Sequence, residues 1–355
     1  MCIKLSFLQI KNLLFSLLFI GTVAHSQTKE EIQKIISTYD LVRLKQLEEK
    51  FSEQYKLEKM EALLFASKNK IPVLQKTNDG PFKELQRIEP DGTPIYFETH
   101  ASGNNATIST RLDYLYEEGK LGLNLMGQNM TSYIWDGGHP LVSHWEYDGP
   151  FAENRVTIED AASEGGVSLL WHAGMVTGMI ASAGLYEHNA KGFAPYCRTK
   201  NYKWNNHLAE ATAAAANGML LSNHSYGWNT NGLPSYLFGS YNTETADWDT
   251  LLFNAPHYLM VTSAGNDGNS GLTYDLLTGR QLCKNNLTVA NVTDAVIDSF
   301  GNLVSTTVFT TSSTGPTDEL RIKPDIAGNG VSVSGTDIQN EWSSNYNSGG
   351  TSWAA

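Results

Sequence analysis

Cysteine is scarce in this chain of 355 residues, which contains three. Cys2 lies in an amino-terminal leader, so only Cys197 and Cys283 remain in the rest of the chain. Neither has the Cys-x-x-Cys or cysteine–histidine spacing that binds zinc, so the sequence does not indicate a structural zinc site. An exported chain could pair the two. However, they lie far apart and nothing in the sequence brings them together, so a disulfide is not predicted.

Positive charge is also in short supply. The chain has 25 Lys and Arg against 37 Asp and Glu, a net charge of −12, and removing Lys4 and Lys11 with the leader changes this to −14. An acidic surface disfavours binding to nucleic acid and to anionic membranes. Hydrophobic residues make up 41% of the chain and charged residues 17%, which predicts a well-filled core rather than disorder.

Long hydrophobic runs are absent after the first 26 residues. The one apolar run, Leu13 to Val23, is too short to span a bilayer. Lys4 and Lys11 precede it, and Ala24-His25-Ser26 follows it as a small-x-small cleavage site. This order predicts a signal peptide over residues 1–26 and export to the extracellular space, the periplasm or the cell surface, without a membrane span.

The part that follows the leader divides into two regions. Residues 27–70 carry apolar side chains at mostly three- and four-residue spacing among Lys and Glu, which predicts a helical stretch. Apolar residues around Pro90-Asp91-Gly92, from Leu85 to Phe97, predict a hairpin. A loop-like run near residues 101–107 marks a boundary. The predicted division is therefore an N-terminal region over 27–105 and a larger domain over 106–355.

Strands and helices alternate in the larger domain. Helices are predicted over residues 172–182 and 207–217, an amphipathic segment over 245–253, and short apolar strands over 130–136, 219–221 and 258–262. Such alternation is typical of α/β proteins with a mostly parallel sheet that is covered on both faces. Ligand sites in these sheets lie at the carboxyl ends of the strands. Asp136, Ser225 and Asn266 all lie at or just after the end of a predicted strand.

Ser352 lies in the run Gly349-Gly350-Thr351-Ser352-Trp353-Ala354-Ala355. The glycine permits close backbone approach, and the small residues let a helix begin at the serine, beside unpaired N–H groups. Taken alone, this pattern is more often a plain helix cap. Upstream, however, His172 precedes a run of small and apolar residues, and Asp136 ends a strand. The chain order Asp, His, Ser is one of the known orders of the Ser-His-Asp triad.

These residue types are what acyl transfer requires. The Ser352 hydroxyl becomes a nucleophile only when a base, here His172, takes its proton. Asp136 would hold the histidine in one tautomer and stabilise the imidazolium that forms. The tetrahedral oxyanion needs two donors, which the Asn266 side chain and the backbone N–H of Ser352 would supply.

From about Leu123 to Ala355 the chain resembles the subtilisin-like serine proteases, or subtilases. The matching runs, in chain order, are Asp136-x-Gly138, His172 to Gly178, Lys191 to Pro195, Ser225-Tyr226-Gly227, Ser263 to Gly268, Asn286 to Ala290, Ser312 to Asp325, and Gly350 to Ala354. The resemblance implies a three-layer α/β fold with a mostly parallel central sheet, preceded here by a small helical N-terminal region. It also implies a secreted serine endopeptidase that acts on proteins or peptides through an acyl-enzyme intermediate.

The resemblance assigns roles to particular residues. Asp136, His172 and Ser352 would be catalytic, and Asn266 would line the oxyanion hole. The substrate-binding residues would be Ser225, Gly227, Ala264 and Gly265, the first two by pairing with the substrate backbone. In the family an N-terminal propeptide often folds against the enzyme and inhibits it, and residues 27–105 occupy that place.

Several alternatives stay open. Asp136 and Asn266 lie in sequences that also form turns, and other histidines compete with His172. Residues 27–105 have a longer charged helix than a compact propeptide, so they could instead stay on the mature enzyme. A non-catalytic relative that only binds peptides would keep the same fold. An α/β-hydrolase esterase is disfavoured because no Gly-x-Ser-x-Gly elbow surrounds Ser352.

The residue after the nucleophile and the end of the chain depart from the family pattern. Trp353 replaces a methionine, and would either narrow the pocket or fill the core. Structural calcium is common in the family, but Asp275, Asp294 and Asp298 are unspecific candidates, so no metal or other cofactor is assigned. We expect a monomer. Because a long buried helix begins at the nucleophile in the family, we also expect this chain to be a fragment of a longer protein, unstable or inactive by itself.

Overall fold

The computed structural model describes residues 28–75, 83–99, 109–116, 119–149, 153–271, 275–347 and 349–355. The predicted signal peptide over 1–26 and the predicted boundary near residues 101–107 lie outside the described residues. Within the described ranges, no helix combines the length and the apolar composition needed to cross a membrane.

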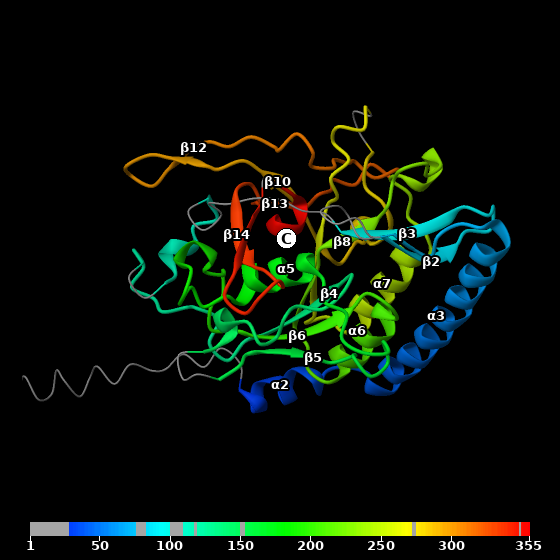
Figure 1. Cartoon of the computed structure of the whole chain (residues 1–355), viewed down its shortest axis with the longest axis horizontal. Helices are drawn as coiled ribbons and strands as arrows, with labels where there is room; N and C mark the ends of the chain where they lie inside the picture. Colours follow the sequence, from blue (N-terminus) through cyan, green and yellow to red (C-terminus); the bar gives the residue numbers. More distant parts are fainter. Residues whose placement is uncertain are drawn as a thin grey trace, which may run out of the picture.

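A seven-stranded sheet forms the centre of the molecule (Figure 1), and neighbouring strands in it run parallel. In spatial order its strands are β13 (Ile326–Asn329), β10 (Leu287–Val292), β9 (Leu259–Ser263), β7 (Leu221–His224), β4 (Thr131–Asp136), β6 (Arg198–Lys203) and β5 (Val156–Ile158). Parallel neighbours need crossover connections, which place helices on the faces of the sheet. The predicted α/β class with a mostly parallel sheet is confirmed.

Neighbouring side chains of β4 point to opposite faces of this sheet, and each packs with different helices. The helices against it are α5 (Trp171–Ala181), α6 (His207–Ala216), α7 (Thr243–Asn254) and α8 (Thr351–Ala354). Ile134 packs with Met175 of α5 and Trp353 of α8. Trp135 belongs instead to the main cluster, which includes Ala211 of α6 and Leu251 of α7. Successive strand side chains point to opposite faces, so helices cover both sides and form a three-layer arrangement.

Close packing explains the small residues of α5. A Cβ atom added at Gly178 would lie 2.6 Å from the backbone nitrogen of Thr336 in β14 (Val333–Thr336). β14 pairs with β15 (Ser344–Asn347) in an antiparallel hairpin that lies against the helix. The small-residue run therefore lets α5 approach this hairpin closely, which fixes the helix that carries His172.

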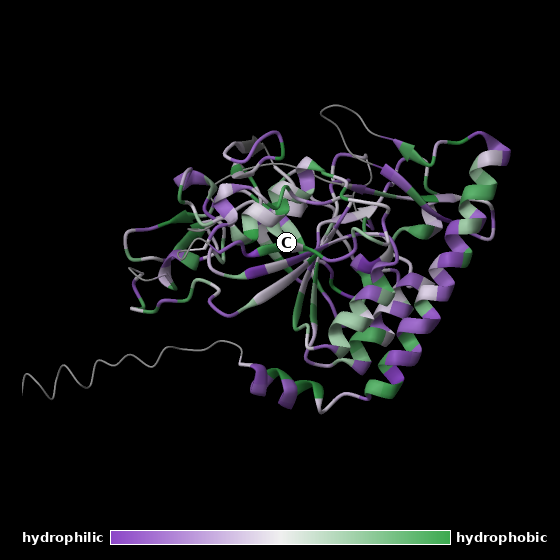
Figure 2. Ribbon diagram, turned by 60° about the horizontal axis from the view of Figure 1, so that its bottom comes forward, coloured by the Kyte–Doolittle hydropathy of each residue, from purple (hydrophilic) through white to green (hydrophobic). Residues whose placement is uncertain are grey.

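The N-terminal region begins with two helices. α2 (Lys29–Ile36) starts with a capping box between Thr28 and Glu31, and α3 (Leu41–Asn69) starts after Asp40, whose side chain accepts a hydrogen bond from the Arg43 N–H. The helical stretch predicted over 27–70 is confirmed as these two helices. Figure 2 shows α3, mostly hydrophilic in colour, alongside α6. Its buried apolar residues are Leu44, Leu47, Phe51, Ala62 and Ala66.

A second sheet joins the N-terminal region to the larger domain. β1 (Leu74–Gln75), β2 (Lys83–Ile88) and β3 (Pro94–Thr99) form it with β8 (Tyr226–Trp228), and all pairs are antiparallel. The hairpin predicted between Leu85 and Phe97 is confirmed as β2 and β3. The two regions therefore share backbone pairing between β3 and β8 as well as the packing of α3.

The remaining described elements are short. They are β11 (Val296–Ile297), β12 (Leu303–Ser305) and the 3-10 turns Leu112–Tyr114, Trp145–Tyr147, His188–Ala190, Ser235–Leu237 and Gly279–Leu282. The helices predicted at 172–182 and 207–217 are confirmed as α5 and α6, and the amphipathic segment over 245–253 lies within α7. The strand predicted over 219–221 is misplaced, since β7 begins at Leu221. Gly218 and Met219 instead close the end of α6, where their N–H groups donate to Ala215 and Ala214.

The cysteines of the described residues are both buried and free. Burial raises the pKa of the Cys197 thiol to about 12. The Cys283 thiol lies 3.5 Å from the carbonyl oxygen of Thr245. A buried thiol of raised pKa is a weak nucleophile, so these cysteines contribute to packing.

Candidate active site

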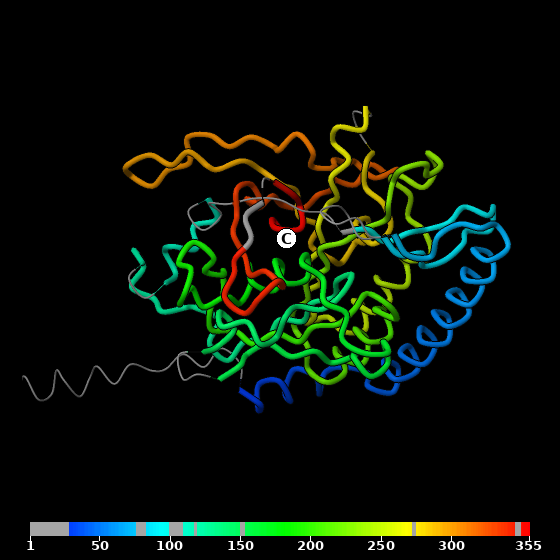
Figure 3. Tube along the Cα trace, in the orientation of Figure 1, coloured from blue at the N-terminus to red at the C-terminus, as the bar shows by residue number. Residues whose placement is uncertain are grey.

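Three neighbouring strands bring the predicted site residues to one edge of the sheet. β9, β7 and β4 are adjacent and parallel, so their carboxyl ends lie together. β4 ends at Asp136, β7 is followed at once by Ser225, and β9 is followed by Ala264, Gly265 and Asn266. Figure 3 traces the last residues of the chain, in red, to the centre of the view, and α8 packs against β9, β10 and β13.

Asp136 and His172 form a buried pair. The Nδ1 atom of His172 lies 2.7 Å from Oδ2 and 2.9 Å from Oδ1 of Asp136, and the side chains are 0% and 1% exposed. Oδ1 also accepts the Gly137 N–H at 2.7 Å, which fixes the carboxylate. A carboxylate only accepts, so Nδ1 carries the proton and Nε2 carries the basic lone pair.

Ser352 lies in the first turn of α8, where backbone N–H groups have no intrahelical acceptor. Its hydroxyl donates to the carbonyl oxygen of Ser225 at 2.8 Å. In this arrangement the hydroxyl proton is directed toward Ser225 rather than toward His172. Rotation about the Cα–Cβ bond of Ser352 would be needed to turn it to the histidine.

The side chain of Asn266 lies against the start of α8. Its Oδ1 atom accepts the Thr351 N–H at 3.0 Å and the Thr351 hydroxyl at 3.1 Å. The Thr351 hydroxyl oxygen in turn accepts the Gly265 N–H at 3.1 Å. Because the amide oxygen is engaged with Thr351, the Nδ2 group is the end of Asn266 that could donate to a substrate.

Trp353 packs in the core beside His172 of α5. The side chain is 3% exposed, and its ring centroid lies 4.9 Å from that of His172 at an interplanar angle of 36°. Trp171 lies edge-on to His172 at 5.8 Å. The sequence left open whether Trp353 narrows the pocket or fills the core. Its burial supports filling the core.

The predicted substrate-binding residues lie on two segments. Ser225 precedes β8, and Gly227 lies in β8 opposite Glu98 of β3. Ala264 donates its N–H to Val289 at 2.9 Å. Gly265 has a φ of +95°, a left-handed conformation that favours glycine and lets the chain turn away from β9 toward Asn266.

Sequence reasoning missed a second histidine–carboxylate pair. His139 Nε2 lies 2.9 Å from Asp160 Oδ1, and His139 Nδ1 accepts the Ser168 N–H at 3.0 Å. Both partners are buried, and Asp160 also accepts the Lys203 N–H. These partners fix loop backbone, so the pair is structural. No spacing in the sequence connects the two residues.

The calcium candidates do not form a cluster. Asp298 accepts hydrogen bonds from Phe300 and Asn302 within its own turn, whereas Asp294 accepts one from the Asn329 side chain. Among the described residues, no group of three or more His, Cys, Asp or Glu side chains could hold a metal ion. These contacts assign no calcium site to Asp294 or Asp298.

A parallel three-layer fold with a buried Asp–His pair near a serine at a helix start is an arrangement found in serine hydrolases. Residues 128–355 match the sequence model of the subtilase family, Peptidase_S8. The match covers well over half of the chain, so the chain belongs to the subtilase family of serine-type peptidases.

Solved structures that are similar to this chain match it at low identity. The CspB protease of Clostridium perfringens is 13% identical with a TM-score of 0.51, over 70% of this chain and 85% of that one. Sphericase is 20% identical with a TM-score of 0.46, over 68% and 78%. The protease domain of PatA is 20% identical with a TM-score of 0.45, over 65% and 76%. No curated protein matches the chain significantly.

Proposed function

We propose that this protein is a secreted serine endopeptidase that hydrolyses peptide bonds through Asp136, His172 and Ser352. Its family makes peptide-bond hydrolysis the expected chemistry. The single observation that carries the proposal is the buried Asp136–His172 pair, at 2.7 Å, on the same sheet edge as the Ser225–Ser352 contact.

The reaction follows from these positions. His172 Nε2 takes the hydroxyl proton of Ser352 as Oγ attacks the substrate carbonyl carbon, and Asp136 stabilises the imidazolium. The tetrahedral intermediate expels the amine, which receives the proton from His172 Nε2, and an acyl-enzyme remains. Water, deprotonated by His172, then attacks the ester and releases the acid.

The oxyanion of the intermediate would lie between two donors. One is the Nδ2 group of Asn266, whose amide oxygen is already engaged by Thr351. The other is the backbone N–H of Ser352 at the start of α8. Donors held before the reaction cost no reorganisation when charge develops, which is why such sites lower the barrier.

We also propose that residues 27–105 act as a propeptide to the peptidase domain over 106–355. β3 occupies the β8 edge that contains Gly227, and a substrate strand would need that edge. The region would therefore keep substrate out until it is displaced. The signal peptide over residues 1–26, export, and a monomeric state complete the proposal.

Active-site labelling tests the peptidase. A fluorophosphonate probe should label the full-length gene product covalently, and Ser352→Ala should abolish the labelling. Ser67→Ala, on the exposed face of α3, is the matched control and should label normally. Peptide binding without any labelling would identify a non-catalytic relative and overturn the enzyme proposal.

Processing tests the propeptide. The full-length gene product should be cut between the N-terminal region and the peptidase domain over time, and Ser352→Ala should stay uncut. Peptidase activity should rise as the N-terminal region is lost. Full activity in an intact, uncut chain would show that residues 27–105 are a permanent part of the enzyme.

A further inference from the structure

Trp145, Tyr186 and Trp342 form an exposed cluster, called here the aromatic patch, although they belong to three separate segments of the chain. The ring centroid of Trp145 lies 5.2 Å from that of Tyr186 at an interplanar angle of 49°, and 5.6 Å from that of Trp342 at 43°. The three residues are 39%, 59% and 57% exposed. Single exposed aromatic residues are common, but contiguous groups of them mark interaction sites.

A buried carboxylate holds Tyr186 beside Trp145. Glu146 follows Trp145 directly in the chain and is 1% exposed. Its side chain accepts the N–H groups of three consecutive residues, Leu185, Tyr186 and Glu187, at 2.9, 2.8 and 2.7 Å. Hydrogen bonds to an ionised acceptor are strong, so the loop after α5 is fixed against the 3-10 turn that contains Trp145.

Backbone contacts tie Trp342 to the same turn. Trp342 lies between β14 and β15, in the hairpin that packs against α5. The Trp145 N–H donates to the Glu341 carbonyl oxygen at 2.8 Å, and His144 Nε2 lies 2.8 Å from the Ser343 carbonyl oxygen. Both chain neighbours of Trp342 are therefore bonded to this turn. The aromatic patch is set by the fold before any ligand binds, which limits the ordering cost of binding.

The charge around the aromatic patch is negative. Burial lowers the pKa of His144 and outweighs the opposing effect of three nearby carboxylates, those of Glu146, Asp337 and Glu341. His144 is therefore neutral near pH 7 and adds no positive charge. Glu341 is partly exposed and directly precedes Trp342, so its carboxylate can reach a ligand on the rings.

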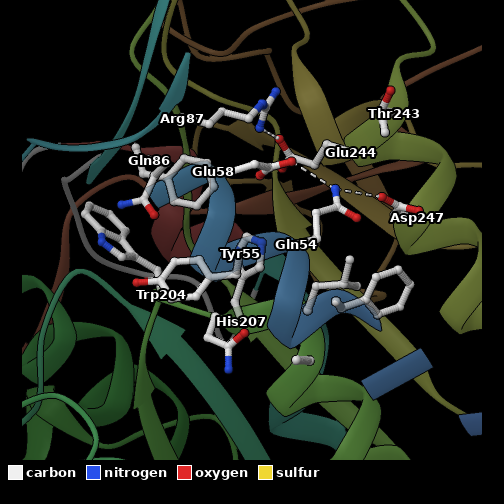
Figure 4. A pocket seen from close by; sticks show the side chains of 15 residues that line it. Gln54, Tyr55, Glu58, Gln86, Arg87, Trp204, His207, Thr243, Glu244 and Asp247 are labelled. Carbon is white, nitrogen blue, oxygen red and sulfur yellow. Dashed lines mark hydrogen bonds and ion pairs between the residues drawn. The ribbon is translucent and has the colours of Figure 1, made fainter. Parts of the chain in front are cut away.

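Aromatic rings elsewhere in the chain are matched with cations of the protein itself. The Arg87 guanidinium lies 4.8 Å from the centroid of the Trp228 ring, and the Arg280 guanidinium lies 3.9 Å from that of Tyr226. Figure 4 shows Arg87 pointing toward Glu244 in a cavity of about 90 Å³ between α3 and the larger domain. In the part of the chain that the structure describes, no Lys or Arg makes such a contact with a ring of the aromatic patch.

These features favour a cationic ligand. The face of an aromatic ring is electron-rich and attracts a cation, most strongly in tryptophan. A planar guanidinium can also stack on the ring, so arginine fits better than lysine. The nearby carboxylates add attraction for the same charge. A neutral sugar would use the ring faces but would gain nothing from the negative charge around them.

We propose that the aromatic patch is a docking site for a basic polypeptide segment, with an arginine side chain seated against Trp145 and Trp342. The proposal goes beyond the peptidase function and does not rest on it. His172 lies in the first turn of α5, whereas Tyr186 follows the last residue of that helix, Ala181. Most of the helix, roughly 15 Å long, therefore separates the aromatic patch from the proposed catalytic histidine.

Peptide binding to the Ser352→Ala form of the full-length gene product tests the proposal, because this form should not cleave the probe. The probe is a fluorescent peptide of alternating arginine and glycine, and its control has citrulline, an uncharged isostere, in place of every arginine. We expect the Kd of the arginine peptide to be about tenfold lower than that of the citrulline peptide. Equal Kd values would overturn the proposal.

Substitutions separate the aromatic patch from the general acidity of the protein. Trp342→Ala should raise the Kd of the arginine peptide about fivefold or more, whereas Trp342→Phe keeps a ring and should raise it less. Glu341→Gln should also raise it, and this change leaves all three rings in place. Phe300→Ala is the matched control, because Phe300 is 87% exposed in the turn between β11 and β12. It should leave the Kd unchanged.

Thermal unfolding of each variant shows whether it is folded under the binding conditions. A folded Trp342→Ala protein that binds the arginine peptide as tightly as the Phe300→Ala protein does would overturn the proposal, and so would unchanged binding in Glu341→Gln if the alanine variant did not fold. Binding of a neutral oligosaccharide such as cellohexaose, without preference for the arginine peptide, would identify a sugar site instead.

Discussion

Ser225 and Ser352 exchange hydrogen bonds. The Ser352 hydroxyl donates to the Ser225 carbonyl oxygen, and the Ser225 hydroxyl donates to the Ser352 carbonyl oxygen, each at 2.8 Å. Ser225 joins β7 to β8, and Ser352 lies in α8, so this pair links the proposed substrate edge to the proposed nucleophile. The substrate edge and the nucleophile are therefore held in a fixed relative position before any substrate binds, so the site is preorganised.

Ser225→Ala should weaken this link. The variant loses the hydroxyl, which lies 2.8 Å from both the Ser352 carbonyl oxygen and Asn223 Oδ1, and keeps the carbonyl that faces the nucleophile. We expect the free energy of unfolding to fall by roughly 1–3 kcal/mol, the usual cost of a buried acceptor left unpaired. We also expect kcat to fall more than KM rises. Urea unfolding and steady-state kinetics measure both. A Ser225→Ala protein no different from Ser67→Ala would contradict the link.

Asp136→Asn should reduce kcat by about 10⁴-fold because an amide donor facing Nδ1 favours the wrong histidine tautomer. The substitution keeps an Oδ1 acceptor for the Gly137 N–H, so little stability should be lost. Steady-state kinetics measure the loss of kcat, and thermal unfolding of the same preparation measures the retained stability. Asp160→Asn is the matched control, because it changes the other buried histidine–carboxylate pair. It should lower stability and leave kcat intact.

Two substitutions at Asn266 should separate its proposed roles. Asn266→Asp keeps an oxygen for the Thr351 N–H but removes the Nδ2 donors, whereas Asn266→Ala removes both. Each should lower kcat by about 10²–10³-fold, the cost of one lost oxyanion donor. Only the alanine variant should also lower the free energy of unfolding. Unchanged kcat in the aspartate variant would exclude Asn266 as a donor.

Local sequence patterns predicted those parts of the structure that depend on short segments. The strand ending at Asp136 and the small-residue helix at His172 can each be identified within about a dozen positions. The parallel order of β9, β7 and β4 then requires that their ends meet at one edge. The contact between Asp136 and His172 follows from these features with little further information.

Other features depend on pairings that no local pattern specifies. The addition of β3 to β8 joins segments more than 120 positions apart, and nothing in the alternation of Phe97 and its neighbours tells which sheet edge they meet. The direction of the Ser352 hydroxyl toward Ser225 is a rotamer choice set by packing. Contacts of this kind come from the tertiary fold, which a single sequence does not show.

Arg87→Met should loosen the attachment of the N-terminal region. Arg87 Nη1 donates to Glu244 at 2.8 Å, and Glu244 also accepts hydrogen bonds from Arg280 and Trp228. Burial disfavours the charged carboxylate, but Arg87 and Arg280 outweigh this and lower the pKa of Glu244 to about 2. Removing one partner of a buried ion pair costs about 3–5 kcal/mol. Because Arg280 still pairs with Glu244, we expect the free energy of unfolding to fall by an amount near the lower end of this range.

Urea unfolding and the rate of limited proteolysis on the carboxyl side of β3 measure this loosening. Arg198→Met is the matched control, since its pair with Glu153 is about half exposed and should contribute less than about 1 kcal/mol. Equal effects of the two substitutions would mean that the Arg87–Glu244 contact does not hold the N-terminal region.

The half-buried carboxyl of Glu210 should make stability fall as pH rises. Burial raises its pKa to about 8, although the Trp135 indole N–H donates to it at 3.0 Å, and the charges of Asp160 and Glu164 act in the same direction as burial. Because the folded-state pKa lies above the unfolded value near 4.5, the stabilisation is complete below pH 4.5 and is lost as pH rises toward 8.

Glu210→Gln should remove this dependence, since the amide oxygen can still accept from Trp135 but cannot ionise. The free energy of unfolding of the unaltered protein should fall relative to the variant by about 1.4 kcal/mol per pH unit between pH 4.5 and 8. His207 acts in the opposite direction, since its lowered pKa removes stability as pH falls below about 6.5, but it contributes equally to both proteins. Urea unfolding across this range measures the difference, and a difference independent of pH would show that Glu210 is ionised in the folded protein.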